Sequence, residues 1–183
     1  PKISVVVPVY NPNEEYLRIM LDSIIRQTYE NWELCIADDK STNPNIRSIL
    51  EEYKKKDSRI KVVYRERNGN ISAASNTALE LATGEYTALV DHDDIVPVEA
   101  LWIMVYYINH YDNQVDLLYS DEDKLDEQGK RYNPYFKGGW NRQLIYQENF
   151  VAHLGVYRTS ILKEIDGFRV GYEGSQDYDI LLR

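Results

Sequence analysis

Cysteine and histidine are scarce in this chain of 183 residues. The single cysteine, Cys35, can form no intramolecular disulfide bond, and one cysteine cannot build a cysteine-based structural zinc site. The three histidines add few further ligands for zinc chemistry. The composition therefore excludes a disulfide scaffold and disfavours a zinc enzyme.

Long hydrophobic runs and basic residues are also in short supply. The longest apolar stretch, residues 100–108, is too short to cross a bilayer. Lys and Arg total 21 against 30 for Asp and Glu, which gives a formal net charge of -9. Because nucleic-acid binding proteins usually present a basic surface, we expect no nucleic-acid partner.

Three common catalytic motifs are absent. The sequence has no G-x-G-x-x-G, no G-x-x-x-x-G-K-[ST] and no G-x-S-x-G. These absences disfavour a nicotinamide site, a Walker-type ATPase and a serine-hydrolase elbow.

Strand-like and helix-like segments alternate through the first two thirds of the chain. A helix start is expected at Asn11-Pro12, which combine an N-cap residue with a proline at the first helical position. Such alternation predicts a single α/β domain with three layers and a mostly parallel central sheet. The expected strands are residues 3–9, 34–37, 60–64, 86–90 and 115–119.

The pattern changes after Ser120. Residues 121–140 are polar and read as long loops or a hairpin, and long loops are often functional. Residues 150–158 resemble another strand, and short helices are expected at 159–165 and from Ser175 onward.

Polar and acidic residues follow three of the expected strands. Right-handed crossovers place Tyr10-Asn11, Asp38-Asp39 and the run 91–94 along one edge of the sheet, where open α/β sheets bind ligands. At this edge Asp91 and Asp93 could share a hard divalent cation, Mg²⁺ or Mn²⁺. The alternative is a solvated acidic turn, in which Asp94 caps the next helix.

Four further residues have both a functional and a structural interpretation. Asp39 can bind a ribose or base, or simply support a turn. Asp177 can act as a general base, or serve only as a favourable charge at a helix N-terminus. His153 and Trp140 can contact an acceptor, Trp140 by stacking on a sugar, or can be packing residues.

Several segments appear together in an order typical of one family. They are residues 5–11, 27–29, 32–34, 37–41, 82–86, 91–94, 119–124, 165–168 and 174–179. With these segments the chain resembles family 2 glycosyltransferases of the GT-A fold, and most closely their bacterial branch for O-antigen, capsule and other surface polysaccharides. The resemblance spans essentially the whole chain.

This resemblance implies a nucleotide-sugar binding site in the first part of the chain. Tyr10 and Asp39 match positions that hold the nucleobase, with Pro8 and Asn11 beside them. Residues 1–120 would then be the nucleotide-sugar-binding half, which is Rossmann-like, and residues 121–183 would form the acceptor side with its loops.

The resemblance also implies an inverting, metal-dependent sugar transfer. Asp91 and Asp93 match the D-x-D motif that contacts the ribose and coordinates Mn²⁺ or Mg²⁺. Asp177 matches the general base. The donor is a nucleotide diphosphate sugar, a UDP-sugar in the first instance, and the acceptor is a glycan or a lipid-linked glycan.

Some positions depart from the family pattern. Residues 73–76 lack the arginine that many relatives direct at the diphosphate, and Gln176-Asp177 replaces the usual Glu-Asp pair. In relatives, the histidine that often completes the metal site lies beyond the last helix, so we expect a domain truncated at its C-terminus.

We also expect a cytoplasmic protein, able to associate peripherally with the inner face of the plasma membrane through segments outside this sequence.

Two other functions fit part of the pattern. A non-catalytic nucleotide- or glycan-binding domain of a larger transferase would keep the fold and lose turnover. A Mg²⁺-dependent phosphatase also places D-x-D after a strand. However, it uses the first strand and prefers Thr or Val where this chain has Ile95.

Overall fold

The computed structural model describes residues 1–112 and 114–183 and is built on a six-stranded sheet. Its strand order is β3-β2-β1-β4-β8-β5. The first four strands in this order are parallel, whereas β8 is antiparallel to both of its neighbours. The strands are β1 (Ile3–Val9), β2 (Trp32–Asp38), β3 (Ile60–Tyr64), β4 (Tyr86–Leu89), β5 (Leu117–Tyr119) and β8 (Gly155–Arg158).

Strands β1 and β2 are buried along their whole length. All seven residues of each are buried, because helices cover both faces. The nearly continuous apolar and β-branched run of β1 is typical of a strand in a parallel sheet, whereas β2 also buries Glu33 and Asp38. The predicted mostly parallel α/β sheet is confirmed.

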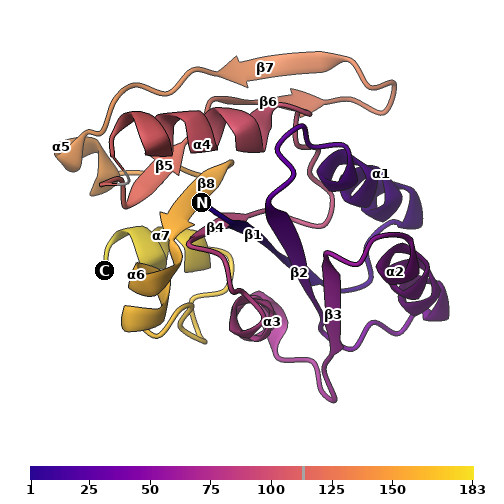
Figure 1. Cartoon of the computed structure of the whole chain (residues 1–183). Coiled ribbons are helices and arrows are strands. Elements are labelled where there is room, and N and C mark those ends of the chain that lie inside the picture. Colours follow the sequence, from indigo (N-terminus) through magenta and orange to yellow (C-terminus); the bar gives the residue numbers. More distant parts are fainter. Residues whose placement is uncertain (113) are drawn as a thin grey trace.

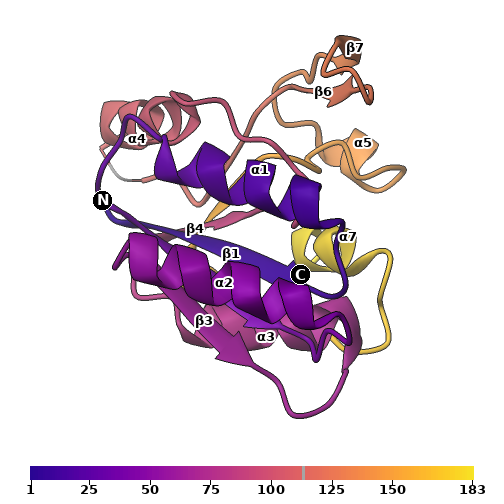
Figure 2. The same ribbon diagram turned by 90° about the vertical axis from the view of Figure 1, so that its right-hand side faces the viewer.

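Helices form the two outer layers (Figures 1 and 2). One core cluster joins one face of the sheet to α1 (Glu14–Ile25), α2 (Pro44–Lys56) and α4 (Ala100–His110). A second joins the opposite face to α3 (Asn70–Glu80), α6 (Thr159–Glu164) and α7 (Gln176–Leu181). Among the described residues, no helix has the length and hydropathy needed to cross a membrane.

The polar stretch after β5 forms a separate hairpin. Strands β6 (Glu122–Leu125) and β7 (Arg131–Tyr135) pair with each other and stand apart from the main sheet (Figure 1). The short helix α5 (Arg142–Ile145) follows them. The hairpin expected between residues 121 and 140 is therefore present.

The first helix begins later than Asn11-Pro12 predicted. Asn13 is the N-cap, and its side-chain oxygen accepts hydrogen bonds from two backbone N–H groups of the first turn. Asn11 instead has φ of 44°, and its side-chain oxygen accepts hydrogen bonds from the N–H groups of Thr42 (2.8 Å) and Asn43 (3.2 Å). Asn11 thus ties the loop after β1 to the loop after β2.

The predicted strand 150–158 is also only partly correct. Residues 150–154 are irregular, and β8 starts at Gly155. This strand lies between β4 and β5, so β5 pairs with β8 and is shorter than predicted. A local hydrophobic pattern does not encode which strand occupies a free sheet edge, so the sequence could not reveal this insertion.

Candidate active site

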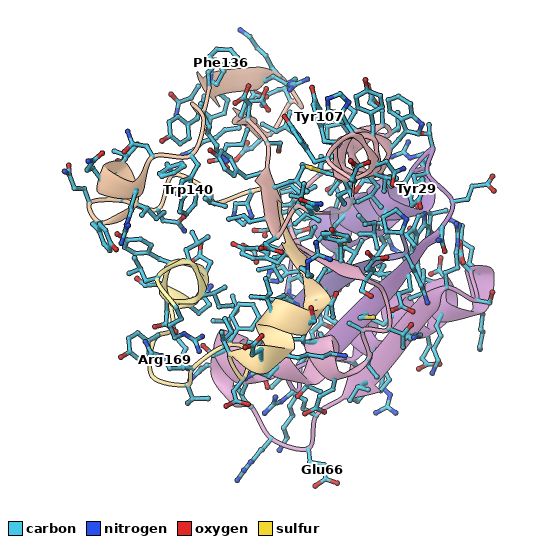
Figure 3. The ribbon with its side chains drawn as sticks, turned by 60° about the vertical axis from the view of Figure 1, so that its left-hand side comes forward. Tyr29, Glu66, Tyr107, Phe136, Trp140 and Arg169 are labelled. Atoms are coloured by element: carbon cyan, nitrogen blue, oxygen red, sulfur yellow. The ribbon has the colours of Figure 1, made fainter. Side chains whose placement is uncertain are left out.

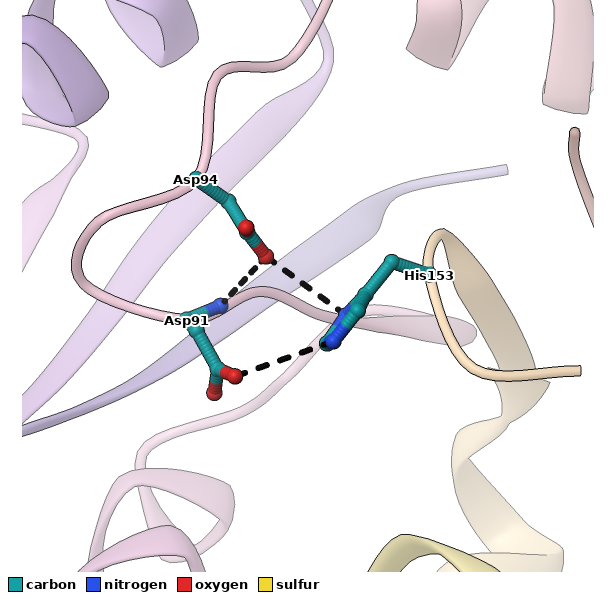
Figure 4. Close-up of side chains that lie close together, drawn as sticks. All are labelled: Asp91, Asp94 and His153. Carbon is teal, nitrogen blue, oxygen red and sulfur yellow. Dashed lines mark hydrogen bonds and ion pairs between the residues drawn. The ribbon is translucent and has the colours of Figure 1, made fainter. Parts of the chain in front are cut away.

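The acidic turn after β4 lies at the carboxyl edge of the sheet, as expected. The turn is tight: Asp94 N–H donates to Asp91 O (3.2 Å), and Asp91 N–H donates to Asp94 Oδ2 (3.3 Å). His153, from the irregular segment before β8, faces both carboxylates (Figure 4). Its Nε2 lies 3.7 Å from Asp91 Oδ2, and its Nδ1 lies 3.5 Å from Asp94 Oδ2.

These three side chains form the acidic cluster of the site. Among residues 1–112 and 114–183, they are the three whose ligand atoms lie within 4.8 Å of one another. Burial raises the pKa of Asp91 and of Asp94 above the usual aspartate value, and the imidazole of His153 acts in the opposite direction. Two neighbouring carboxylates and one imidazole are donors that suit Mn²⁺ or Mg²⁺.

Asp93 is not part of the acidic cluster. Its side chain is exposed and lines a cavity of about 660 Å³ between the 93–97 segment, α4 and the β6–β7 hairpin. Asp94 and His153 line the same cavity, but Asp93 has no ligand atom within the cluster. The structure therefore groups Asp91 with Asp94, whereas the motif pairs Asp91 with Asp93.

Asp177, in the first turn of α7, reaches the same place from the other side of the site. Asp91, His153 and Asp177 all line one small cavity of about 70 Å³. The side-chain amide of Asn149 donates a hydrogen bond to Asp177 Oδ2 (2.7 Å). This contact fixes the orientation of the carboxylate in the cavity.

A third cavity, here called the Tyr10 cavity, contains three of the predicted nucleotide-binding residues. Pro8, Tyr10 and Asp39 line a space of about 230 Å³, together with Asn68 and Asn70 at the start of α3. Pro8 also lines the small cavity beside Asp177, so the two spaces are neighbours. The aromatic ring of Tyr10 is half-exposed and available for stacking.

In the Tyr10 cavity, contacts with Gly69 and Arg65 hold the side chain of Asp39 in place. Its buried carboxylate accepts hydrogen bonds from the N–H of Gly69 (3.0 Å to each oxygen) and lies 2.9 Å from Arg65 Nε. The two partners neutralise the charge and fix the plane of the carboxylate. Lone pairs that remain on its oxygens are free to accept hydrogen bonds from a base or a ribose.

Two predicted site residues lie elsewhere. Asn11 braces the loops, as described above, through its contacts with Thr42 and Asn43. Trp140 is 55% exposed beside α5, and its ring centroid lies 5.8 Å from that of Phe150 (Figure 3). Trp140 does not belong to the acidic cluster, whereas His153, its companion in the acceptor prediction, does.

Sequence reasoning gave too little weight to two residues of the site. From the sequence, Asp94 has a role only in the alternative interpretation, as a cap of the next helix, yet that helix begins at Ala100 and the carboxylate of Asp94 faces His153. Asn149, which holds Asp177, comes from a segment 28 positions earlier in the chain. Asp94 could have been found as the third acid in the 91–94 run, but Asn149 gives no signal in its local sequence.

The comparisons with known proteins agree with this fold. The sequence model of the family described as "Glycosyl transferase family 2" matches residues 4–166. The crystal structure of S. aureus TarS 1–349 in complex with UDP superposes with a TM-score of 0.79 at 29% sequence identity. The match covers 98% of this chain and 54% of that chain. This likeness confirms the GT-A fold expected from the sequence.

Two curated relatives match over the full length of the chain. The O-antigen biosynthesis protein RfbC of Myxococcus xanthus is 35% identical over 184 residues, which are 14% of its own length. The uncharacterised protein y4gI of Sinorhizobium fredii is 49% identical over 183 residues, which are 20% of its length. The chain thus spans a fifth or less of either relative.

Proposed function

The chain belongs to glycosyl transferase family 2, and on that premise we propose that it transfers a sugar from a nucleotide diphosphate sugar to an acceptor hydroxyl. The product is a glycosidic bond in a bacterial surface polysaccharide. The similarity to RfbC, a protein named for O-antigen biosynthesis, supports this assignment.

One observation carries the proposal: two members of the acidic cluster and a candidate base meet in the same small cavity. Asp91, His153 and Asp177 line it together. Through Pro8 it adjoins the space lined by Tyr10 and Asp39. A nucleotide in the second space would therefore extend its diphosphate toward the acidic cluster and its sugar toward Asp177.

The residues present fit a divalent cation. Asp91 is shared by the motif and by the geometric cluster. The second carboxylate is Asp93 by the motif and Asp94 by the geometry, with His153 as a nitrogen donor. Mn²⁺ or Mg²⁺ held there would stabilise the negative charge that develops on the departing diphosphate. The same cation would let a chain of net charge -9 bind an anionic donor.

Asp177 is the general base in this proposal. An alcohol is a weak nucleophile, so a carboxylate must accept its proton as the hydroxyl oxygen attacks the anomeric carbon. The new C–O bond forms as the bond to the diphosphate breaks. Attack from the face opposite the leaving group inverts the anomeric centre.

A UDP-sugar is the donor we favour. TarS 1–349, to which this chain is similar, has been crystallised with UDP. For the acceptor we propose a glycan or a lipid-linked glycan, bound on the side of residues 121–183 where Trp140 is exposed. Association with the inner face of the plasma membrane would then bring the protein to a lipid-linked acceptor.

Calorimetry on the full-length protein tests the proposal. UDP, dTDP and GDP are titrated with and without Mn²⁺, and transfer is then assayed with sugars of the nucleotide that binds. Cation-dependent binding of one nucleotide, followed by turnover, would support a transferase. Binding without turnover would instead indicate a non-catalytic module, and binding of no nucleotide would refute the proposal.

A further inference from the structure

A buried lysine lies directly behind His153. The side chain of Lys137 is only 1% exposed, although it follows the exposed β6–β7 hairpin. Its ammonium group donates to Glu122 Oε2 (3.0 Å), to the carbonyl of Val151 (2.7 Å) and to the carbonyl of His153 (2.6 Å). These three contacts use all three of its N–H groups.

Placing this charge inside the protein carries a cost. Burial lowers the pKa of Lys137, and the carboxylate of Glu122 acts in the opposite direction. The buried ammonium group donates hydrogen bonds to two backbone carbonyls, which an apolar side chain could not do. Its role depends on the segment to which those carbonyls belong.

The two carbonyls belong to an irregular segment, residues 151–154. Its backbone N–H groups donate to side chains: those of residues 151 and 152 donate to Asn149 Oδ1, at 3.2 Å each. The N–H of His153 donates to Glu122 Oε2 (3.0 Å), and that of residue 154 donates to Ser120 Oγ (3.1 Å). Side chains therefore define the path of this segment, which is not paired as a strand.

The backbone of this segment is also strained. Ala152 has φ of 34°, in the left-handed region that residues other than glycine rarely occupy. The turn at Ala152 directs the carbonyls on either side of it to the same ammonium group. Without the Lys137 ammonium group, the two carbonyls would lose their shared donor in a strained turn, and we expect the backbone of residues 151–154 to change its conformation.

We propose that Lys137 is a positioning residue, which holds His153 in the place where its ring faces Asp91 and Asp94. This inference rests on the proposed function, because it gives Lys137 a role in shaping the proposed cation site. Lys137 is not proposed to bind the cation or the substrate, since its three N–H groups are used by Glu122 and by the two backbone carbonyls. It acts through the backbone of His153, and Glu122 supports it by binding both the ammonium group and the His153 N–H.

The test compares Lys137→Met with Lys130→Met in the full-length protein. Lys130, in the turn of the same hairpin, is exposed and serves as the matched control. The readouts are the affinity for Mn²⁺ in the presence of UDP, and the coupling of the bound Mn²⁺ to a histidine nitrogen, measured by pulsed electron paramagnetic resonance. His153→Ala identifies the signal that comes from His153.

We expect Lys137→Met to lose the nitrogen coupling and to bind Mn²⁺ about 10- to 100-fold more weakly, the range seen when a residue that orients a metal ligand is removed. Lys130→Met should match the wild type in both. Lys137→Gln, which keeps two N–H donors but no charge, should fall between them, and thermal unfolding reports whether each variant is folded.

Two results would overturn the inference in different ways. If folded Lys137→Met keeps both the affinity and the nitrogen coupling of the wild type, Lys137 does not position His153, and the proposed function is untouched. If the wild type itself binds no Mn²⁺ with UDP, the cation site of the proposed function fails, and the role of Lys137 fails with it.

Discussion

Carboxylates lie at both ends of the parallel sheet, and their surroundings differ. At the amino end, Glu33 is 2% exposed and is surrounded by donors. It forms ion pairs with Lys2 and Lys61 and accepts hydrogen bonds from the hydroxyl of Ser4 and the N–H of Thr83. At the carboxyl end, Asp91 and Asp94 are only half-buried, and among the described residues the side chain that faces both of them is the imidazole of His153.

The pKa directions express the same difference. Burial opposes ionisation of Glu33, but the hydrogen bonds from Lys2, Lys61 and Ser4 outweigh it and hold the pKa well below the usual range. For Asp91 and Asp94 burial dominates, and their pKa values are raised. At the amino end, lysines of the protein itself balance the charge of Glu33. At the carboxyl end, the negative charge of Asp91 and Asp94 can be balanced by a bound cation.

The largest effect should come from Asp177→Asn in the full-length protein. The amide cannot accept the proton of the attacking hydroxyl, so we expect transfer to fall about 10²- to 10⁴-fold while donor affinity stays unchanged. Initial rates and nucleotide titrations measure the two quantities. Glu148→Gln, at an exposed nearby position, should have no effect. Wild-type rates in Asp177→Asn would exclude it as the base.

Glu33→Ala should have the next largest effect, on stability. Removing the carboxylate leaves the hydroxyl of Ser4 and the N–H of Thr83 without their acceptor, while Lys2 and Lys61 are exposed enough to be solvated, so we expect a loss of about 1–3 kcal/mol in the free energy of unfolding. Denaturant titration measures it. The matched control is Glu52→Ala, which breaks an exposed ion pair with Arg18 and should cost less than about 1 kcal/mol. Equal losses of stability in Glu33→Ala and Glu52→Ala would show that the buried network around Glu33 stabilises the fold no more than an exposed ion pair does.

Asp91→Asn should behave in the opposite manner. Because it removes a half-buried carboxylate whose pKa is raised in the folded state, we expect the folded state to be at least as stable as the wild type. Affinity for Mn²⁺ with UDP should fall at least about 100-fold, since even residues that only support a metal ligand contribute 10- to 100-fold. A destabilised variant with intact Mn²⁺ binding would reverse the comparison.

Asp93→Asn and Asp94→Asn sharpen the same prediction. The two residues are adjacent and chemically matched, but only Asp94 faces His153. If geometry decides the ligand, Asp94→Asn weakens Mn²⁺ binding more, and if the D-x-D motif decides it, Asp93→Asn does. Unchanged binding in both would leave Asp91 without a second carboxylate and would contradict the site.

The smallest effect concerns the dependence of stability on pH. The folded-state pKa of Glu33 is lowered, so its stabilisation is present above the unfolded value of about 4.3 and is lost progressively as the pH falls from that value toward the lower folded-state pKa. The pKa values of Asp91 and Asp94 are raised, so their cost exists above about pH 4 and disappears as they become protonated. Unfolding of Glu33→Ala and Asp91→Asn at pH 7 and pH 3 measures both: each variant should approach the wild type at the lower pH.

The sequence predicts the sheet better than it predicts the site. The apolar run of β1 and the acidic turn after β4 follow from local composition, whereas the burial of Glu33 within β2 depends on Lys2 and Lys61 from other parts of the chain. The insertion of β8 beside β4, and the path of residues 151–154, depend on partners far away in the chain. Lys137 shows the limit most clearly, since its side chain is buried although the residues before it in the chain are exposed.

The most direct test of the account is the location of the cation. Crystals of the protein grown with UDP and Mn²⁺ give an anomalous difference map in which manganese identifies itself. We predict one peak between Asp91 and His153, bridged to the diphosphate, and none beside Glu33. A protein that binds UDP with no manganese at the acidic cluster would contradict the central claim.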